Sequence, residues 1–81
     1  MLRIATKSKL TPEKIIEKSI DYFGLNGYKL EITDKTDTSV YFEGGGGLVE
    51  VSVTLENGKT TVDFLSREWD FQVKEFIKTI R

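Results

Sequence analysis

The sequence predicts an α+β domain that forms a two-layer sandwich, with an antiparallel four-stranded meander in one layer and two helices packed on one face of it. Three observations predict this class. Apolar residues recur at helical spacing near both ends of the chain, they alternate at a spacing of two between residues 28 and 65, and glycine-containing turn sequences divide that alternating stretch. The 81 residues are enough for one hydrophobic core, so the whole chain, residues 1–81, is expected to be a single domain.

The composition excludes several classes of function. The chain has no cysteine and no histidine, so it cannot form a disulfide, a thiolate nucleophile, an imidazole base or a Cys/His zinc site. Its formal net charge of -1 provides no overall field that would attract nucleic acid or an anionic membrane. No apolar stretch approaches the roughly 20 residues of a membrane span. We therefore expect a cytoplasmic protein with no cofactor and no membrane contact.

The first residues of the chain show a period of two. Leu2, Ile4 and Thr6 alternate with Arg3, Ala5 and Lys7. This pattern is consistent with an extra edge strand at the N-terminus of the meander, or with an ordered arm.

A helix start follows at Thr11 and Pro12, because the threonine hydroxyl can cap a helix and proline fits its first position. We expect the helix to run from Pro12 to about Phe23 and to end at a left-handed Gly24, with Leu25 closing the contact typical of such ends. Its inner stripe is expected to be Ile16, Ile20 and Phe23, with Ile15 and Tyr22 on one flank.

Turn sequences define the register of the four predicted strands. Asn57-Gly58 favours a two-residue type I′ turn, which needs positive φ at both central positions, and Gly45-Gly46 provides a second tight turn. The two turns pair Leu55 with Thr60, Val53 with Val62, Val51 with Phe64, Phe42 with Val49 and Val40 with Val51. With Lys35, Thr36 and Asp37 in the first hairpin loop, Leu30 lies opposite Phe42 and Ile32 opposite Val40, so that one apolar face continues across the sheet.

The last helix has an apolar face formed by Trp69, Val73, Phe76, Ile77 and Ile80. Ser66 or Asp70 can cap its start. Phe71 points away from the apolar face if the helix has begun by then. We expect it instead to precede the first full turn and to pack near Tyr22. The alternative is an exposed aromatic side chain, which would favour contact with a partner or a second copy.

This order of elements resembles the TATA-binding-protein-like fold: a short N-terminal segment, a helix, a meander with a tetraglycine hairpin, and a closing helix that begins after Ser66-Arg67-Glu68-Trp69. It is also similar to a small uncharacterised archaeal family of αββββα two-layer sandwiches. The resemblance covers nearly the whole chain and implies the fold. That family has no established activity, so the resemblance implies no functional residues, and a likeness to a DNA-binding protein is an analogy of fold alone.

The sheet face away from the helices is the predicted binding surface. In the predicted register Glu31 lies opposite Tyr41, Tyr41 lies opposite Glu50, and Glu43 lies two residues from Tyr41 on the same strand. Carboxylates around one tyrosine suit a divalent cation, or a lysine or arginine from another protein. The alternative is an ordinary solvated sheet face that binds nothing.

The glycine run Gly44, Gly45, Gly46 and Gly47 is included in the predicted binding surface. A phosphate-binding loop would need a helix and a Lys-Ser or Lys-Thr pair after the glycines, whereas an alternating stretch, residues 48–51, follows here. The run is therefore expected to be a hairpin tip. Its surplus of glycine suits either a mobile tip or close approach of a ligand to the backbone.

These residues favour a non-catalytic binding module that recognises a protein or a small ligand. One alternative is a nucleic-acid-associated protein that uses the basic residues near the start of the chain, Arg3, Lys7, Lys9, Lys14 and Lys18. The carboxylates of the sheet face would repel a phosphate backbone, which counts against binding nucleic acid there. Another alternative is a carboxylate-dependent metal enzyme, for which we assign no catalytic residue and no metal ligand.

Overall fold

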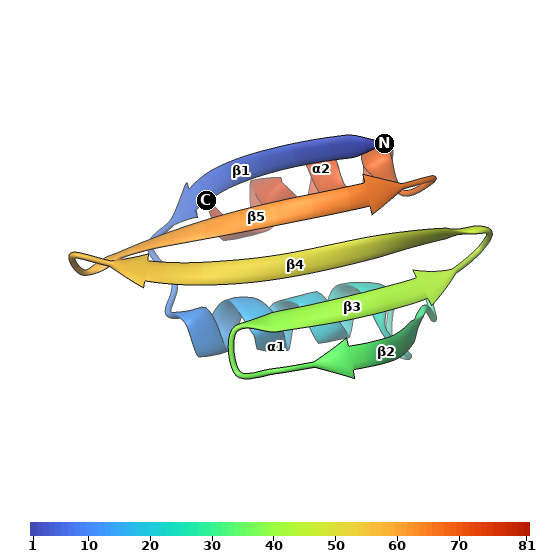
Figure 1. The fold of residues 1–81 in the computed structure, drawn as a ribbon, viewed down its shortest axis with the longest axis horizontal. Coiled ribbons are helices and arrows are strands. Elements are labelled where there is room, and N and C mark those ends of the chain that lie inside the picture. Colours follow the sequence, from blue (N-terminus) through green and yellow to red (C-terminus); the bar gives the residue numbers. More distant parts are fainter.

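A computed structural model describes the whole chain, residues 1–81, as a sheet covered by two helices (Figure 1). The elements in chain order are β1 (Leu2–Ser8), α1 (Pro12–Phe23), β2 (Glu31–Lys35), β3 (Ser39–Gly44), β4 (Gly47–Glu56), β5 (Lys59–Arg67) and α2 (Asp70–Ile80). This architecture confirms the predicted α+β two-layer sandwich. The sheet has five strands, so the N-terminal alternation forms a strand and not an arm.

The strands lie in the order β1-β5-β4-β3-β2, and all neighbours are antiparallel. The first strand of the chain therefore pairs with the last, and β1 and β2 form the two edges of the sheet (Figure 1). Helix α1 packs behind β3 and β4, and α2 packs behind β5 and β1. Both helices lie on the same side, which leaves the other face of the sheet uncovered.

The hydrophobic core lies between the two layers and contains 15 buried apolar residues. Phe76 is at its centre, with ring centroids 5.5 Å from Phe23 and 5.9 Å from Phe64. On β3, Val40 and Phe42 are fully buried while Tyr41 between them is 37% exposed. The predicted alternation along this strand is confirmed, and it determines which side chains reach the uncovered face.

Two of the predicted hairpins form with the predicted register. Asn57 and Gly58 have φ of 53° and 77°, and Gly45 and Gly46 have φ of 59° and 81°, so both turns use positive φ at both central positions. All of the cross-strand pairs predicted between β3, β4 and β5 are observed.

The first hairpin is different, and its predicted register is wrong. Ile32 lies opposite Phe42, Glu31 opposite Glu43 and Asp34 opposite Tyr41, with an irregularity in β2 between Ile32 and Asp34. The turn closes further along the chain than expected, because the backbone N–H of Thr36 donates to the carbonyl of Ser39 at 2.8 Å. Leu30 is buried but precedes the strand, and every residue of β2 is exposed.

The end of α1 also differs from the prediction. Gly24 has φ of -83°, so it is not left-handed, and Leu25 is 84% exposed and closes no contact. The following loop folds back onto the helix instead: Tyr28 and Leu30 donate backbone hydrogen bonds to the carbonyls of Tyr22 and Phe23. Glycine is needed at position 24 because a Cβ atom there would lie 2.4 Å from the carbonyl oxygen of Ile20.

The inner face of α1 is rotated from the predicted stripe. Ile15, Ser19 and Phe23 are fully buried and Ile16 is nearly so, whereas Ile20 is only partly buried. The predicted start at Thr11 and Pro12 is confirmed, and the Thr11 hydroxyl accepts a hydrogen bond from the backbone N–H of Lys14.

The start of α2 corrects two further predictions. Ser66 does not cap the helix, because β5 continues to Arg67 and Ser66 pairs within it with Leu2 and Val49. Asp70 is the first helical residue and not the cap; Trp69 takes the cap position without a side-chain bond to the helix. Phe71 is 68% exposed, so the expectation that it packs near Tyr22 is wrong.

Candidate functional site

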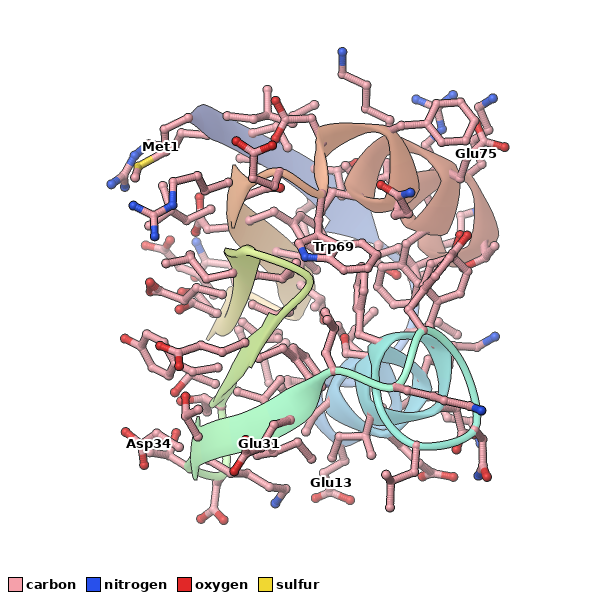
Figure 2. All side chains as sticks on the ribbon, turned by 90° about the vertical axis from the view of Figure 1, so that its right-hand side faces the viewer. Met1, Glu13, Glu31, Asp34, Trp69 and Glu75 are labelled. Carbon is pink, nitrogen blue, oxygen red and sulfur yellow. The ribbon has the colours of Figure 1, made fainter.

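The uncovered side of the sheet, which we call the open face, is the surface that the sequence predicts as a binding site. Its side chains come from alternate residues of all five strands and form rows across the sheet. One row contains Arg67, Leu48, Glu43 and Glu31, and the next contains Arg3, Leu65, Glu50, Tyr41 and Asp34. Figure 2, which looks along the strands, shows Asp34 projecting on the side of the sheet away from the helices.

Charge on the open face is divided between the two halves of the sheet. The half formed by β2, β3 and the start of β4 has four carboxylates: Glu31, Asp34, Glu43 and Glu50. The half formed by β1 and β5 has four basic residues: Arg3, Lys7, Lys59 and Arg67. Asp63 on β5 is an exception, and Glu56 lies opposite Lys59 at the far end of β4. The two halves meet at Leu48 and Leu65, which are partly buried.

None of these charged groups forms an ion pair within the chain. The only ion pair in the structure joins Lys78 to Glu75 in α2, at 2.8 Å. Along the rows, a basic residue on β5 and a carboxylate on β3 are two strands apart, which is about 10 Å between backbones. The charges of the open face are therefore free to pair with charges from another molecule.

Tyr41 lies in the acidic half, and its neighbours are only partly those predicted. It is opposite Glu50, as predicted, but its neighbour on β2 is Asp34 and not Glu31. The negative charge of Glu50 raises the pKa of the Tyr41 phenol, with smaller contributions from burial, a hydrogen bond with Glu50 and the charge of Asp34. Tyr41 therefore remains a neutral hydrogen-bond donor at physiological pH. The sequence has no signal for Asp34, because its position depends on the irregularity in β2.

The glycine run has packing roles inside the chain. A Cβ atom on Gly45 would lie 2.7 Å from Cζ2 of Trp69, and one on Gly47 would lie 2.0 Å from the carbonyl oxygen of Arg67. The indole N–H of Trp69 donates to the carbonyl of Gly44 at 2.9 Å, beside the hairpin (Figure 2). The close approach to the backbone is thus made by the protein's own atoms, and ligand binding by these glycines stays a prediction.

The basic residues of the nucleic-acid alternative do not form one surface. Arg3 and Lys7 lie on the open face, whereas Lys14 and Lys18 lie on α1 in the other layer. The structure instead places Lys7 and Lys9 beside Lys59 and Arg81, around a pocket of about 270 Å³. This smaller cluster lies at one end of the sheet.

The arrangement of the carboxylates gives little support to the alternative of a carboxylate-dependent metal enzyme. The structure contains no group of three or more acidic side chains close enough to hold a metal ion together. The carboxylates of the open face are spread along three strands, and Glu31 and Glu50 lie in different rows. Ser66 has a buried hydroxyl without a hydrogen-bond partner, and its basic neighbour on β5, Arg67, belongs to the opposite face of the sheet.

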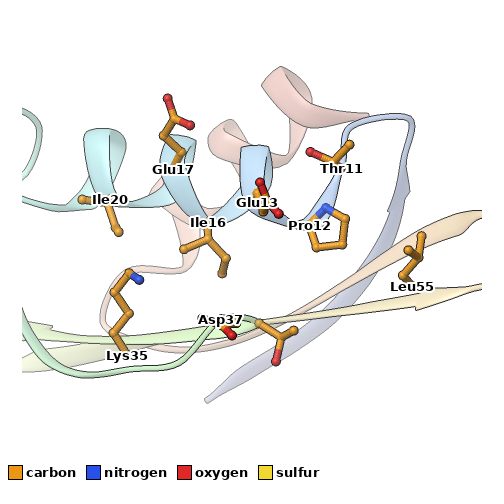
Figure 3. Close-up of a pocket in the computed structure, with 10 residues that line it drawn as sticks. Thr11, Pro12, Glu13, Ile16, Glu17, Ile20, Lys35, Asp37 and Leu55 are labelled. Carbon is orange, nitrogen blue, oxygen red and sulfur yellow. The ribbon is translucent and has the colours of Figure 1, made fainter.

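Sequence reasoning missed a groove on the helix side of the sheet. It has a volume of about 660 Å³ and lies between α1, the turn that joins β2 to β3, and the far end of β4. Figure 3 shows Pro12 and Ile16 directed from α1 toward the strands and Lys35 directed back toward α1. Leu55, on the β4 side, is 59% exposed. The groove lies where α1, which packs mainly on β3 and β4, faces the β2–β3 turn and the exposed Leu55 of β4.

The fold and the open face define an α+β sandwich with one uncovered sheet face of divided charge. Comparison of the chain with protein-family models, with curated proteins and with solved structures found no match. The resemblance to the TATA-binding-protein-like fold and to an archaeal family therefore stays a prediction. Neither helix of the structure is long and apolar enough to span a membrane.

Proposed function

We propose that this chain is a non-catalytic binding module that recognises a protein partner through the open face. The observation that supports this proposal is the division of charge: with the exceptions of Asp63 and Glu56, the carboxylates and the basic residues lie on opposite halves of one face, and none has an ion-pair partner in the chain. An ordinary solvated face gains stability by mixing opposite charges across neighbouring strands. Here opposite charges are direct neighbours across strands only at Glu56 and Lys59, and the other carboxylates and basic residues are mostly in separate halves, an arrangement that suits steering and orienting a charged partner.

The partner that fits this face has the complementary pattern. It presents basic groups to β2 and β3 and acidic groups to β1 and β5, separated by about 10 Å or more. Leu48 and Leu65 provide apolar contact where the two charged halves meet, and Tyr41 adds to it from the acidic half. Because charge steers association and a small apolar centre supplies limited affinity, we expect binding that weakens as salt increases.

The proposal is tested by NMR titration of the labelled protein with an arginine-rich peptide and, separately, a glutamate-rich peptide. The first should shift the amide signals of Glu31, Asp34 and Glu43, and the second those of Arg3 and Arg67. Glu43→Lys should weaken the first response, while the matched control Glu17→Lys on α1 should leave it unchanged. Shifts confined to the helix layer would contradict the proposal. Stronger responses to a DNA duplex or to Mg²⁺ would favour nucleic-acid or metal binding instead.

We also propose a second candidate function, the binding of a small amphipathic amine in the groove beside α1. The specific observation is that Leu55, Ile20 and Pro12 present exposed or partly exposed apolar surface there, in a volume within the range of small-molecule sites. Three carboxylates and one lysine line the groove, so its charge favours a cation. Hexylamine should shift the signals of Ile16 and Ile20. Leu55→Ser should weaken this response and Phe71→Ser should not; equal effects of both variants would contradict the proposal.

A further inference from the structure

We propose that the open face docks against the open face of a second copy of this chain, with β1 and β5 of one copy over β2 and β3 of the other. The inference rests on the proposed function of the open face and names its partner. It follows from the order of charges across the strands and from the register that the structure gives them.

The order of charges selects one symmetry. Two stacked identical sheets can be related by a two-fold axis that runs across the strands or by one that runs along them. An axis across the strands places β1 over β1 of the second copy, so that Arg3 and Lys7 would face like charges. An axis along the strands and above β4 places β1 over β2 and β5 over β3, so that basic and acidic halves meet at both ends of the interface. Only the second arrangement is electrostatically complementary.

The register then identifies the contacts. Rotation about an axis along the strands keeps each row facing the same row of the second copy. Arg67 therefore lies over Glu43 of the second copy, and Arg3 lies over Asp34 of the second copy, each to within about one row because packed sheets are rotated by about 30°. The symmetry repeats each contact, which gives four ion pairs. All four of these side chains are exposed in the single chain.

The centre of the interface is apolar and small. Leu48 faces Leu48 of the second copy near the axis, and Leu65 faces Tyr41 of the second copy. Five strands spaced by about 4.8 Å, with about seven residues each, give a face of about 24 by 23 Å, so the two copies bury about 1,100 Å² in total. That area lies at the lower limit of stable interfaces, and it predicts a weak, concentration-dependent dimer.

One contact opposes the association. Glu50 lies on β4 in the middle of its row, so it faces Glu50 of the second copy close to the axis. Two carboxylates at this position repel each other, and removing their charge should tighten the dimer. Glu50→Gln should therefore strengthen self-association, whereas most substitutions in the interface should weaken it. A stronger dimer cannot be explained by general damage to the interface.

The deciding experiment uses charge reversal at Arg67 and Glu43, measured by sedimentation equilibrium over a range of protein concentrations. Arg67→Glu and Glu43→Arg should each weaken self-association by about tenfold or more, because each creates two like-charge contacts per dimer. A mixture of the two variants should associate as well as the wild type, because opposite charges meet again at both contacts. The double variant, with Arg67→Glu and Glu43→Arg in one chain, should also self-associate as the wild type does. The control Lys14→Glu on α1 should leave self-association unchanged.

Three outcomes would overturn this inference. The first is a wild-type protein that stays monomeric at millimolar concentration. The second is a dimer that neither single reversal weakens, which would place the interface elsewhere. The third is failure of the mixture to associate when the two variants are both folded by circular dichroism. If the wild type is monomeric but its open face still responds to the charged peptides, the dimer is contradicted. The proposed binding function of the open face is then retained.

Discussion

The tetraglycine hairpin provides a test of how the β3–β4 turn and the start of α2 depend on each other. At Gly45, φ is 59°, and a Cβ atom would lie 2.7 Å from Cζ2 of Trp69. The left-handed backbone costs a residue with a side chain about 1 to 2 kcal/mol. Displacing the indole adds about 1 to 3 kcal/mol of overpacking and weakens the hydrogen bond from Trp69 to Gly44. Gly45→Ala should therefore lower the free energy of unfolding by about 2 to 5 kcal/mol.

Gly46→Ala is the matched control for this prediction. Gly46 also has a positive φ of 81°, but no atom lies within 4 Å of the position of its Cβ. Gly46→Ala should therefore lower the free energy of unfolding only by the cost of the left-handed backbone, about 1 to 2 kcal/mol. Denaturant unfolding measures both losses, and the fluorescence of Trp69, the only tryptophan in the chain, reports whether the indole has moved. Equal losses at the two positions, with the same tryptophan emission, would refute the assigned contact.

Three further predictions concern the core and the open face. Phe42→Ala should lower the free energy of unfolding by about 3 to 5 kcal/mol, because the side chain is fully buried, whereas Tyr41→Ala on the open face should cost much less; similar losses in denaturant unfolding would mean that the faces are misassigned. Ser66→Ala should raise the free energy of unfolding by about 1 kcal/mol, because the buried hydroxyl lacks a hydrogen-bond partner, and a clear loss would show that it has one. Glu50→Gln should lower the pKa of Tyr41 toward its ordinary value, since the charge of Glu50 is the largest cause of its increase; ultraviolet titration of the phenol measures this, and an unchanged pKa would contradict the pairing.

The proposals for the open face have a shared consequence. A homodimer of the proposed geometry covers the same charges that a different protein partner would use. Partner binding and self-association would then compete, and the weak dimer expected from the small interface allows a partner to displace the second copy. Competition is measurable as a loss of dimer on addition of the charged peptides.

Much of the fold could be predicted from local sequence. The turn at Asn57 and Gly58 requires positive φ at consecutive residues, and few residue types accept that conformation. Once that turn and the Gly45-Gly46 turn are placed, alternation determines which residues of β3, β4 and β5 are buried. The start of α1 is equally local, because the Thr11 hydroxyl and the ring of Pro12 act within one turn of helix.

The missed features depend on contacts between distant parts of the chain. The register of β2 follows from the loop that ties Leu30 to the end of α1 and from the Thr36–Ser39 turn, and neither has a two-residue turn sequence such as Asn57-Gly58 from which the pairing can be counted. The end of β5 depends on pairing with β1 and β4, so Ser66 continues a strand where a helix cap was expected. Phe71 is exposed because α2 begins at Asp70 and turns its other side to the core.

The sequence by itself determined the fold class, three of the strands, the start of the first helix and the side of β3 that Tyr41 occupies, because each depends on periodicity or on a turn whose backbone only certain residues adopt. Only the tertiary structure decided that Asp34 lies beside Tyr41, that three of the four glycines make room for Leu30, Trp69 and the backbone of Arg67, and that acidic and basic side chains occupy opposite halves of the open face. These features depend on which strands become neighbours. In this chain the first strand pairs with the last, and that pairing brings Arg3 and Lys7 beside β5 and away from β2.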